Sequence, residues 1–375
     1  MKLRNLIAVL AAAAIVAGVY LFAVTREDES RGAVSVWYVE GGLADDELAE
    51  AVRDYNKSSS RGELPVKLVA FESESEMAEA FDSGAPDLVF CSHYRAFDMH
   101  SRSKLADISA QLGADVPDYP KELSSRSACI GKSFFPVGAD VPVLLVNSAL
   151  AQGEELADLS ALSTSAEAYR AAVGVPFYAV DSYSALFFTE LLREGEEFSA
   201  TLEAKPSEAY AVLYNLLAEN AYTGAMAILP QGTAADAVVR GELACAVVMT
   251  SALPARLDSA LEVRAVPPLA VGSGSGTVGT AWGFAVPAMG SRSTADIAAF
   301  LSWLFSGNRD ARLALQCRLT PAQPSSLITN DTLWSTLLTL DPGGIVALPS
   351  PDGAFAAHQE TFETDFRARL AFLSE

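Results

Sequence analysis

The sequence predicts an α/β protein of two lobes, built on mixed and mainly parallel sheets. Three observations support this prediction. The chain has 375 residues, which is more than one hydrophobic core normally serves. Half of the residues are apolar and 19% are charged, as in an ordinary folded protein. Strand-like and helix-like apolar patterns alternate from residue 34 to residue 91.

The first strand is predicted at Val34 to Tyr38, a short run of residues that favour β structure. The segment after it has apolar side chains on one face of a helix, at the spacing i, i+3, i+4 and i+7: Leu48, Ala51, Val52 and Tyr55. The acidic residues 45–47 suit the first turn of this helix, because the positive end of the helix dipole favours carboxylates.

A second strand is predicted at Val66 to Phe71, followed by a helix that starts at Ser73. Glu76 stands three residues after Ser73, which is the spacing of a capping box, and Gly84 ends the helix. A third, apolar strand follows at Leu88 to Cys91. This succession predicts right-handed βαβ crossovers and a largely parallel sheet with helices on both faces.

The N-terminal residues 1–32 are predicted to form a membrane anchor or signal peptide with a linker. Lys2 and Arg4 precede an apolar run from Leu6 to Val24, which is 19 residues long and would reach about 28 Å as a helix. An uncleaved anchor is favoured, because secretory apolar regions are usually shorter. The cationic start stays in the cytoplasm, so the rest of the chain is expected to be extracytoplasmic, either anchored to the cell membrane or secreted to the periplasm or cell surface.

The formal net charge is −21, which disfavours nucleic acid as a partner. Four cysteines are scattered through the chain, at Cys91, Cys129, Cys245 and Cys317, without any CxxC pair. An extracytoplasmic location would permit disulfides, but buried free thiols are the preferred interpretation.

Short blocks spread over residues 33–327 resemble one family in their kind and order. The blocks are Val34–Trp37, Ala51–Asn56, Ser83–Val89, Leu105–Ile108, Phe135–Gly138, Val143–Asn147, Val239–Val247, Ala265–Pro268, Ala298–Gly307 and Leu319–Pro321. Together they are similar to the extracellular solute-binding proteins of bacterial ABC importers, in the group that includes many sugar binders. Two features differ from many sugar-binding members: Val146–Ser148 replaces a Tyr-Asn-Lys triplet, and no Pro-x-Thr-Trp helix start follows Leu150.

The resemblance implies a two-lobed periplasmic-binding-protein-like fold with a ligand cleft between the lobes. The lobes would comprise residues 33–140 with 268–318, and residues 141–267 with 319–375. The implied function is that of an extracytoplasmic solute-binding subunit of an ABC importer, which captures a small solute, carbohydrate among the candidates, and delivers it to a membrane permease. The alternative is a membrane-tethered ligand sensor with the same fold. The chain is expected to act as a monomer, without cofactor, metal or enzymatic activity.

Open α/β sheets bind ligands beyond the carboxyl ends of their strands, so the residues just past each predicted strand are the candidate ligand-binding residues. These are Trp37, Tyr38, Glu40, His93, Tyr94, Asp140, Asp181, Tyr183, Thr250, Ser251 and Trp282. Each has a structural alternative. The aromatic rings could belong to the core, Glu40 could lie in a solvated turn, and Thr250 and Ser251 could cap a following helix.

Several enzymatic and metal-binding motifs are absent or incomplete. The glycines at 274, 276 and 279 match a dinucleotide-binding pattern, but a predicted strand from Trp282 to Val286 stands where the phosphate site needs a helix. Cys91, His93 and His100 do not have the spacing of a metal motif. The sequence also lacks HExxH, P-loop and G-x-S-x-G motifs. These observations favour binding over catalysis.

Overall fold

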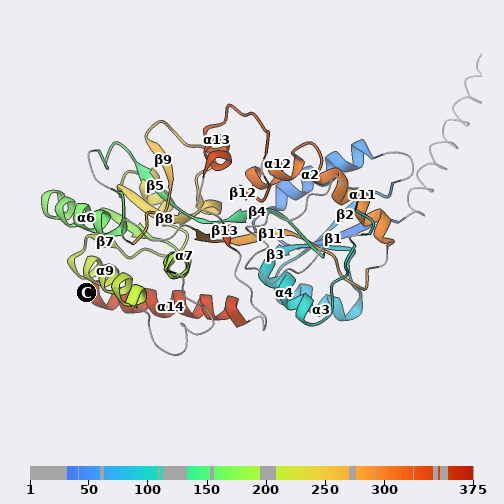
Figure 1. Cartoon of the computed structure of the whole chain (residues 1–375), viewed down its shortest axis with the longest axis horizontal. Helices are drawn as coiled ribbons and strands as arrows, with labels where there is room; N and C mark the ends of the chain where they lie inside the picture. The colour runs from blue at the N-terminus through green and yellow to red at the C-terminus, as the bar shows by residue number, and fades with distance from the viewer. Residues whose placement is uncertain are drawn as a thin grey trace, which may run out of the picture.

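Two lobes, each built around its own β-sheet, lie side by side in the computed structural model of the chain (Figure 1). The structure describes residues 32–40, 42–59, 63–108, 110–112, 133–152, 156–194, 208–269, 276–290, 292–323, 325–340, 345–346 and 354–374. The predicted anchor run, Cys129 and residues 272–275 of the glycine-rich run lie outside these ranges. No helix within these ranges is long and apolar enough to span a membrane.

The first lobe contains a six-stranded sheet with the strand order β12-β4-β11-β3-β1-β2. The strands are β1 Val34–Val39, β2 Val66–Phe71, β3 Leu88–Ser92, β4 Phe134–Asp140, β11 Thr280–Ala285 and β12 Thr320–Pro321. Strand β1 pairs parallel with β2 and β3, whereas β11 pairs antiparallel with β3 and β4. The predicted βαβ units are confirmed, and the late strand β11 makes the sheet mixed.

Helices cover both faces of this sheet, as predicted from the alternation of strands and helices. The helices on one face are α2 Asp45–Ser58, α11 Thr294–Leu304 and α12 Arg309–Gln316, and those on the other are α3 Glu74–Ser83 and α4 His93–Ser101 (Figure 1). Side chains of β3 alternate between the two faces: Leu88 and Phe90 pack with the first group, and Val89 and Cys91 with the second. The buried strand therefore supplies two cores.

The predicted start of α3 is confirmed in its main feature. The backbone N–H of Glu76 donates to the Ser73 hydroxyl at 3.1 Å. The Glu76 carboxylate accepts from the backbone N–H of Glu72 at 2.7 Å, one residue before the partner that a capping box would use. Gly84 follows the helix as its C-cap.

The second lobe contains a five-stranded mixed sheet with the order β7-β6-β8-β5-β9. The strands are β5 Pro142–Asn147, β6 Tyr178–Val180, β7 Met226–Ala227, β8 Cys245–Met249 and β9 Leu261–Ala265. Helices on its two faces are α6 Leu159–Val173, α7 Tyr183–Arg193, α9 Glu208–Thr223 and α14 Ala354–Ser374 on one, and α10 Ala234–Val239 and α13 Thr332–Thr339 on the other. The C-terminal helix α14 packs on α7 and α9, so it completes the second lobe.

The chain crosses between the lobes in three places. Strand β4 leads through Val141 directly into β5, and β9 returns to β11 through the segment 266–279. The third crossing connects β12 to α13 of the second lobe. Strand β12 pairs with β4, so the first sheet continues past residue 318. A short parallel pair, β10 Thr277–Val278 with β13 Ile345–Val346, accompanies the return segment.

A buried ion pair holds the return segment to α7. The Arg193 guanidinium lies 2.5 Å from the Glu190 carboxylate, and their side chains are 6% and 1% exposed. Arg193 also donates to the carbonyls of Val266 and Gly276 at 3.0 Å each, while the backbone N–H of Leu269 donates to Glu190 at 2.7 Å. The pair therefore fixes both ends of the return segment against one helix.

Close approach of two strands explains a glycine in the centre of the first sheet. Strand β11 changes register against β4 between Trp282 and Gly283. A Cβ atom on Gly283 would lie 2.1 Å from the carbonyl oxygen of Phe135. Only glycine fits at this bulge, because any side chain would push the two strands apart.

Three of the four cysteines are buried free thiols, as predicted: Cys91, Cys245 and Cys317. Burial raises the pKa of each thiol well above its ordinary value. These thiols stay protonated at neutral pH and behave as small apolar side chains.

Candidate functional site

The carboxyl ends of strands from both sheets adjoin the first crossing between the lobes. Strand β4 ends at Asp140, and the crossing residue Val141 is hydrogen-bonded to Thr250, just past the end of β8. In the first sheet β3 runs parallel to β4, and in the second sheet β6 runs parallel to β8. The carboxyl ends of β3 and β6 therefore lie on the same sheet edges as those of β4 and β8. The predicted site residues that follow β3, β4, β6 and β8 therefore lie on the edges of the sheets that adjoin this junction.

Asp140, Thr250 and Ser251 form one hydrogen-bonded group at this junction. Asp140 accepts from the Thr250 hydroxyl at 2.9 Å, the Ser251 backbone N–H at 2.9 Å and the Ser251 hydroxyl at 2.6 Å. The alternative role of Thr250 and Ser251 as helix caps is wrong, because both residues lie inside the short 3-10 helix Thr250–Ala252. Its N-cap position is Met249, which makes no side-chain cap bond. These side chains join the two lobes at their crossing, and their contact with a ligand stays a prediction.

The pKa of Asp140 is raised, chiefly by burial, while its bonds to Ser251 and Thr250 and the charge of Arg318 act in the opposite direction. The folded chain therefore holds the Asp140 proton more tightly than the unfolded chain does. Its contribution to stability is fully present below its ordinary pKa of 3.8 and is lost as the pH rises through the raised pKa.

The substitution Asp140→Asn is expected to remove this titration. The difference in unfolding free energy, wild type minus variant, should decrease as the pH rises from about 4 towards neutrality. Urea unfolding at a series of pH values measures this difference, with Asp365→Asn on the exposed face of α14 as the control. A difference that stays constant with pH would show that Asp140 does not titrate as its burial indicates.

In the first lobe, His93 and Tyr94 lie together at the start of α4, and Trp282 lies on the neighbouring strand β11, where it pairs with Ser92. His93 Nδ1 accepts from the backbone N–H of Ala281 at 3.1 Å, and its ring lies 3.9 Å from that of Tyr94. Tyr94 is hydrogen-bonded to Thr280, and burial raises the pKa of its hydroxyl. Trp282 stacks on Phe90 at 6.0 Å and is half-buried.

The other three first-lobe candidates are dispersed around β1. The Trp37 ring packs 4.7 Å from Phe71 and 5.4 Å from Phe81, which are the contacts of a core residue. Tyr38 is half-buried against the core on the other face of the sheet. Glu40 is exposed in the turn after β1, as its structural alternative expects. Ligand contacts of these residues stay predictions.

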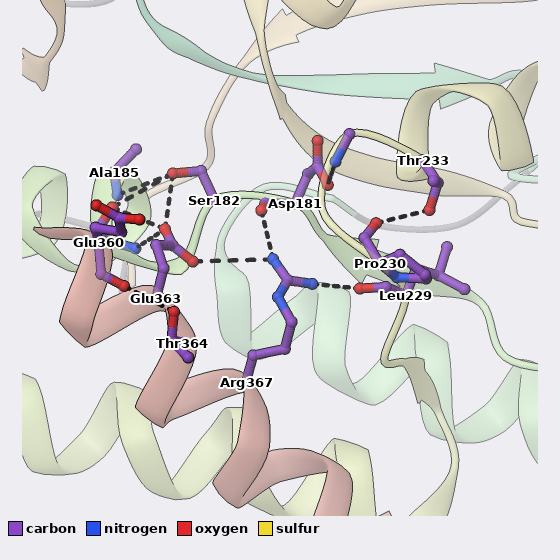
Figure 2. Close-up of polar contacts among 12 residues, drawn as sticks. Asp181, Ser182, Ala185, Leu229, Pro230, Thr233, Glu360, Glu363, Thr364 and Arg367 are labelled. Atoms are coloured by element: carbon purple, nitrogen blue, oxygen red, sulfur yellow. Dashed lines mark hydrogen bonds and ion pairs between the residues drawn. The ribbon is translucent and has the colours of Figure 1, made fainter. Parts of the chain in front are cut away.

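At the edge of the second sheet, Asp181 lies beside Arg367 of the C-terminal helix (Figure 2). Arg367 of α14 donates through Nη2 to the Asp181 carbonyl at 2.8 Å and through Nη1 to the Leu229 carbonyl. Its guanidinium lies over the ring of the fully buried Tyr183, 5.1 Å from the centroid. The Asp181 carboxylate accepts from the Gly232 backbone N–H at 2.7 Å. Burial is the main cause of the raised pKa of the Asp181 carboxyl group.

Glu363 belongs to α14, one helical turn before Arg367, and its side chain contacts the N-terminus of α7. Its Oε1 accepts from the Ser182 hydroxyl at 3.0 Å and from the Ser184 backbone N–H and hydroxyl at 2.7 Å each. The residue is only 6% exposed, and its Oε2 has no hydrogen-bond partner among the described residues and lies 3.9 Å from Arg367 Nη2. The carboxylate thus occupies the positive end of the helix dipole.

A pocket of about 610 Å³ lies against this group. It is lined by Ser182, Ser184, Gln231, Glu360, Glu363, Thr364, Arg367, Ala368 and Ala371. Ser182 and Gln231 follow the carboxyl ends of β6 and β7, and the lining residues from Glu360 onward belong to α14. The pocket is therefore at the sheet edge where the sequence argument expects a ligand, with α14 as one wall.

None of the predicted site residues lines this pocket, although Asp181 and Tyr183 flank Ser182. Sequence reasoning missed α14, which is nearly 180 residues away along the chain. A signal was present in its pattern. Phe362, Phe366 and Leu370 form one apolar face, and Glu360, Glu363, Thr364 and Arg367 recur at helical spacing on a polar face.

No family model matches the chain, and no curated protein matches it in sequence. Solved structures do match. The cyclic α-maltosyl-1,6-maltose binding protein from Arthrobacter globiformis has a TM-score of 0.67 and 16% identity, covering 92% of this chain and 95% of that one. UgpB from Mycobacterium tuberculosis, in complex with glycerophosphocholine, has a TM-score of 0.69 and 18% identity, with coverages of 91% and 98%.

A third similar structure is the spermidine/putrescine ABC transporter substrate-binding protein PotD from Streptococcus pneumoniae. It has a TM-score of 0.66 and 13% identity, and the match covers 92% of this chain and all of that one. The similarity to each of the three thus extends over both lobes.

Proposed function

Because the chain has the two-lobed fold of the periplasmic solute-binding proteins, we propose that it is the extracytoplasmic solute-binding subunit of an ABC importer. It captures a small solute between its lobes and presents it to a membrane permease. The N-terminal segment tethers it to the membrane, and the chain acts as a monomer and as a binding protein, not an enzyme. The proposed division of the lobes lies near residues 140 and 267 and, because β12 Thr320–Pro321 pairs with β4 of the first sheet, beyond residue 321.

The observation that carries this proposal is the polar pocket at the carboxyl edge of the second sheet. The hydroxyls of Ser182 and Thr364 and the amide of Gln231 supply donors and acceptors that could orient a small solute. The pocket lies on the same sheet edge as the crossing at Val141, so a ligand held there is close to the chain segment about which the lobes would close.

A thermal-shift screen of the full chain in mild detergent tests the proposal. The panel contains sugars, amino acids, amines, phosphate esters and carboxylates. A solute that binds only the folded chain adds about 2.7 kcal/mol of stability at 100 times its dissociation constant. One solute class should therefore raise the melting temperature. If no solute changes the melting temperature, the proposed function is wrong, and a sensory or structural role is favoured instead.

A further inference from the structure

The pocket on the second lobe has an excess of negative charge. Within the described part of the chain, Glu360 and Glu363 line it and Asp181 flanks it, whereas Arg367 is the one cationic residue of its lining. Three carboxylates and one guanidinium give a formal charge of −2 at neutral pH. The chain as a whole carries −21, so its long-range field also attracts cations.

Arg367 is occupied by contacts with its own chain. Its two Nη atoms donate to the backbone carbonyls of Asp181 and Leu229, and its flat face covers the Tyr183 ring. Its charge also lies 3.9 Å from Glu363 Oε2. An anionic ligand would have to compete with these contacts, so this arginine is poorly placed to recognise phosphate or carboxylate groups.

Glu363 has a carboxylate oxygen that no hydrogen-bond donor of the described residues satisfies, although Arg367 Nη2 lies 3.9 Å from it. The residue is more than nine-tenths buried and lines the pocket, yet Oε2 has no hydrogen-bond partner among the described residues. A buried carboxylate oxygen without a donor is costly, and a ligand ammonium group would satisfy it. Glu360, one turn earlier on α14, is exposed at the same pocket and can pair with a second cationic group.

The lining also lacks the flat surface that a sugar ring would use. No aromatic side chain is among the nine lining residues that the structure describes. Stacking on aromatic rings is the usual apolar contribution to sugar binding, and the small Ala368 and Ala371 do not replace it. Hydroxyl and carboxylate acceptors without an aromatic platform suit a compact, donor-rich ligand.

From these observations we infer that the pocket between α7 and α14 binds a cationic solute that carries aliphatic amine groups. Glu363 and Glu360 pair with the ammonium groups, and Ser182, Thr364 and Gln231 accept or donate the remaining hydrogen bonds. The inference rests on the proposed function and names the solute class for it.

Isothermal titration calorimetry of the full chain with putrescine and spermidine tests the inference, with maltose and glycerol 3-phosphate as neutral and anionic comparisons. The amines should bind, and Glu363→Gln should weaken them about tenfold or more. Glu360→Gln should weaken them about two- to fivefold, because this side chain is exposed. Asp365→Asn changes an exposed carboxylate on the same helix outside the pocket, and it should leave the affinity unchanged.

The outcomes separate the two proposals. Amine binding that both pocket variants weaken and Asp365→Asn does not supports the inference, and Glu360→Gln keeps the test valid if Glu363→Gln fails to fold. Amine binding that Glu360→Gln and Glu363→Gln leave unchanged overturns the assignment to this pocket. Binding of maltose or the phosphate ester in place of the amines overturns the solute class and leaves the proposed function standing. If no solute of any class binds, both proposals fall.

Discussion

Replacing Glu190 with alanine should lower the free energy of unfolding by about 3–5 kcal/mol. The substitution leaves the Arg193 guanidinium buried without its carboxylate, since the Arg193 side chain is only 6% exposed. It also removes the acceptor of the Leu269 backbone N–H. Two buried polar groups then lose their partners at once. Urea unfolding followed by circular dichroism measures the change.

The control is Glu194→Ala, which removes an exposed carboxylate one turn later and should change stability by less than about 0.5 kcal/mol. The double variant Glu190→Leu with Arg193→Met should lose much less than Glu190→Ala, because neither charge is left buried alone. If Glu190→Ala and Glu194→Ala were equally stable, the buried pair would contribute nothing to holding the return segment.

Phe366→Ala should destabilise the chain by about 3–5 kcal/mol. The Phe366 ring is buried among four aromatic rings: 4.9 Å from Phe187, 5.1 Å from Tyr183, 5.4 Å from Phe362 and 5.6 Å from Tyr214. Truncation leaves a cavity between α14, α7 and α9 that these rings cannot fill. Thermal and urea unfolding measure the loss.

Phe372→Ala is the matched control, because Phe372 is on the same helix and 78% exposed. It should leave the stability nearly unchanged. Phe366→Ala should also weaken solute binding, since α14 carries Glu363 and Arg367 into the pocket. Normal stability of the Phe366 variant would mean that α14 is not part of the second core.

Local patterns were sufficient to predict the first lobe's βαβ units. The strands at Val34 and Val66, the cap at Ser73 and the end at Gly84 all depend on neighbours within a few residues. The antiparallel insertion of β11 between β3 and β4 could not be predicted this way, because it pairs Trp282 with residues far away in the sequence. The run after the glycine-rich segment was correctly predicted as a strand, but its place in the sheet depends on tertiary packing.

The candidate site was predicted less completely than the fold. The rule about carboxyl ends led to the sheet edge where the pocket lies, and it selected Asp181 and Tyr183, which flank the lining residue Ser182. It could not select Glu363, because that residue reaches the edge from a helix packed across it. It also could not tell a ring in the core, such as Trp37, from one exposed to ligand, since both positions favour the same residue types.

The position of β11 has a consequence for the order in which a newly made chain can fold. Strands β3 and β4 are complete once residue 140 has been synthesised, but the strand that joins them is residues 280–285. Until then the first sheet exists only as separate pieces with exposed edges, and its closure spans a long intervening segment. The first sheet of a nascent chain is therefore kept from its final structure until synthesis is about three-quarters complete. In that state the edges of β3 and β4 lack their partner strand and are open to pairing with other chains.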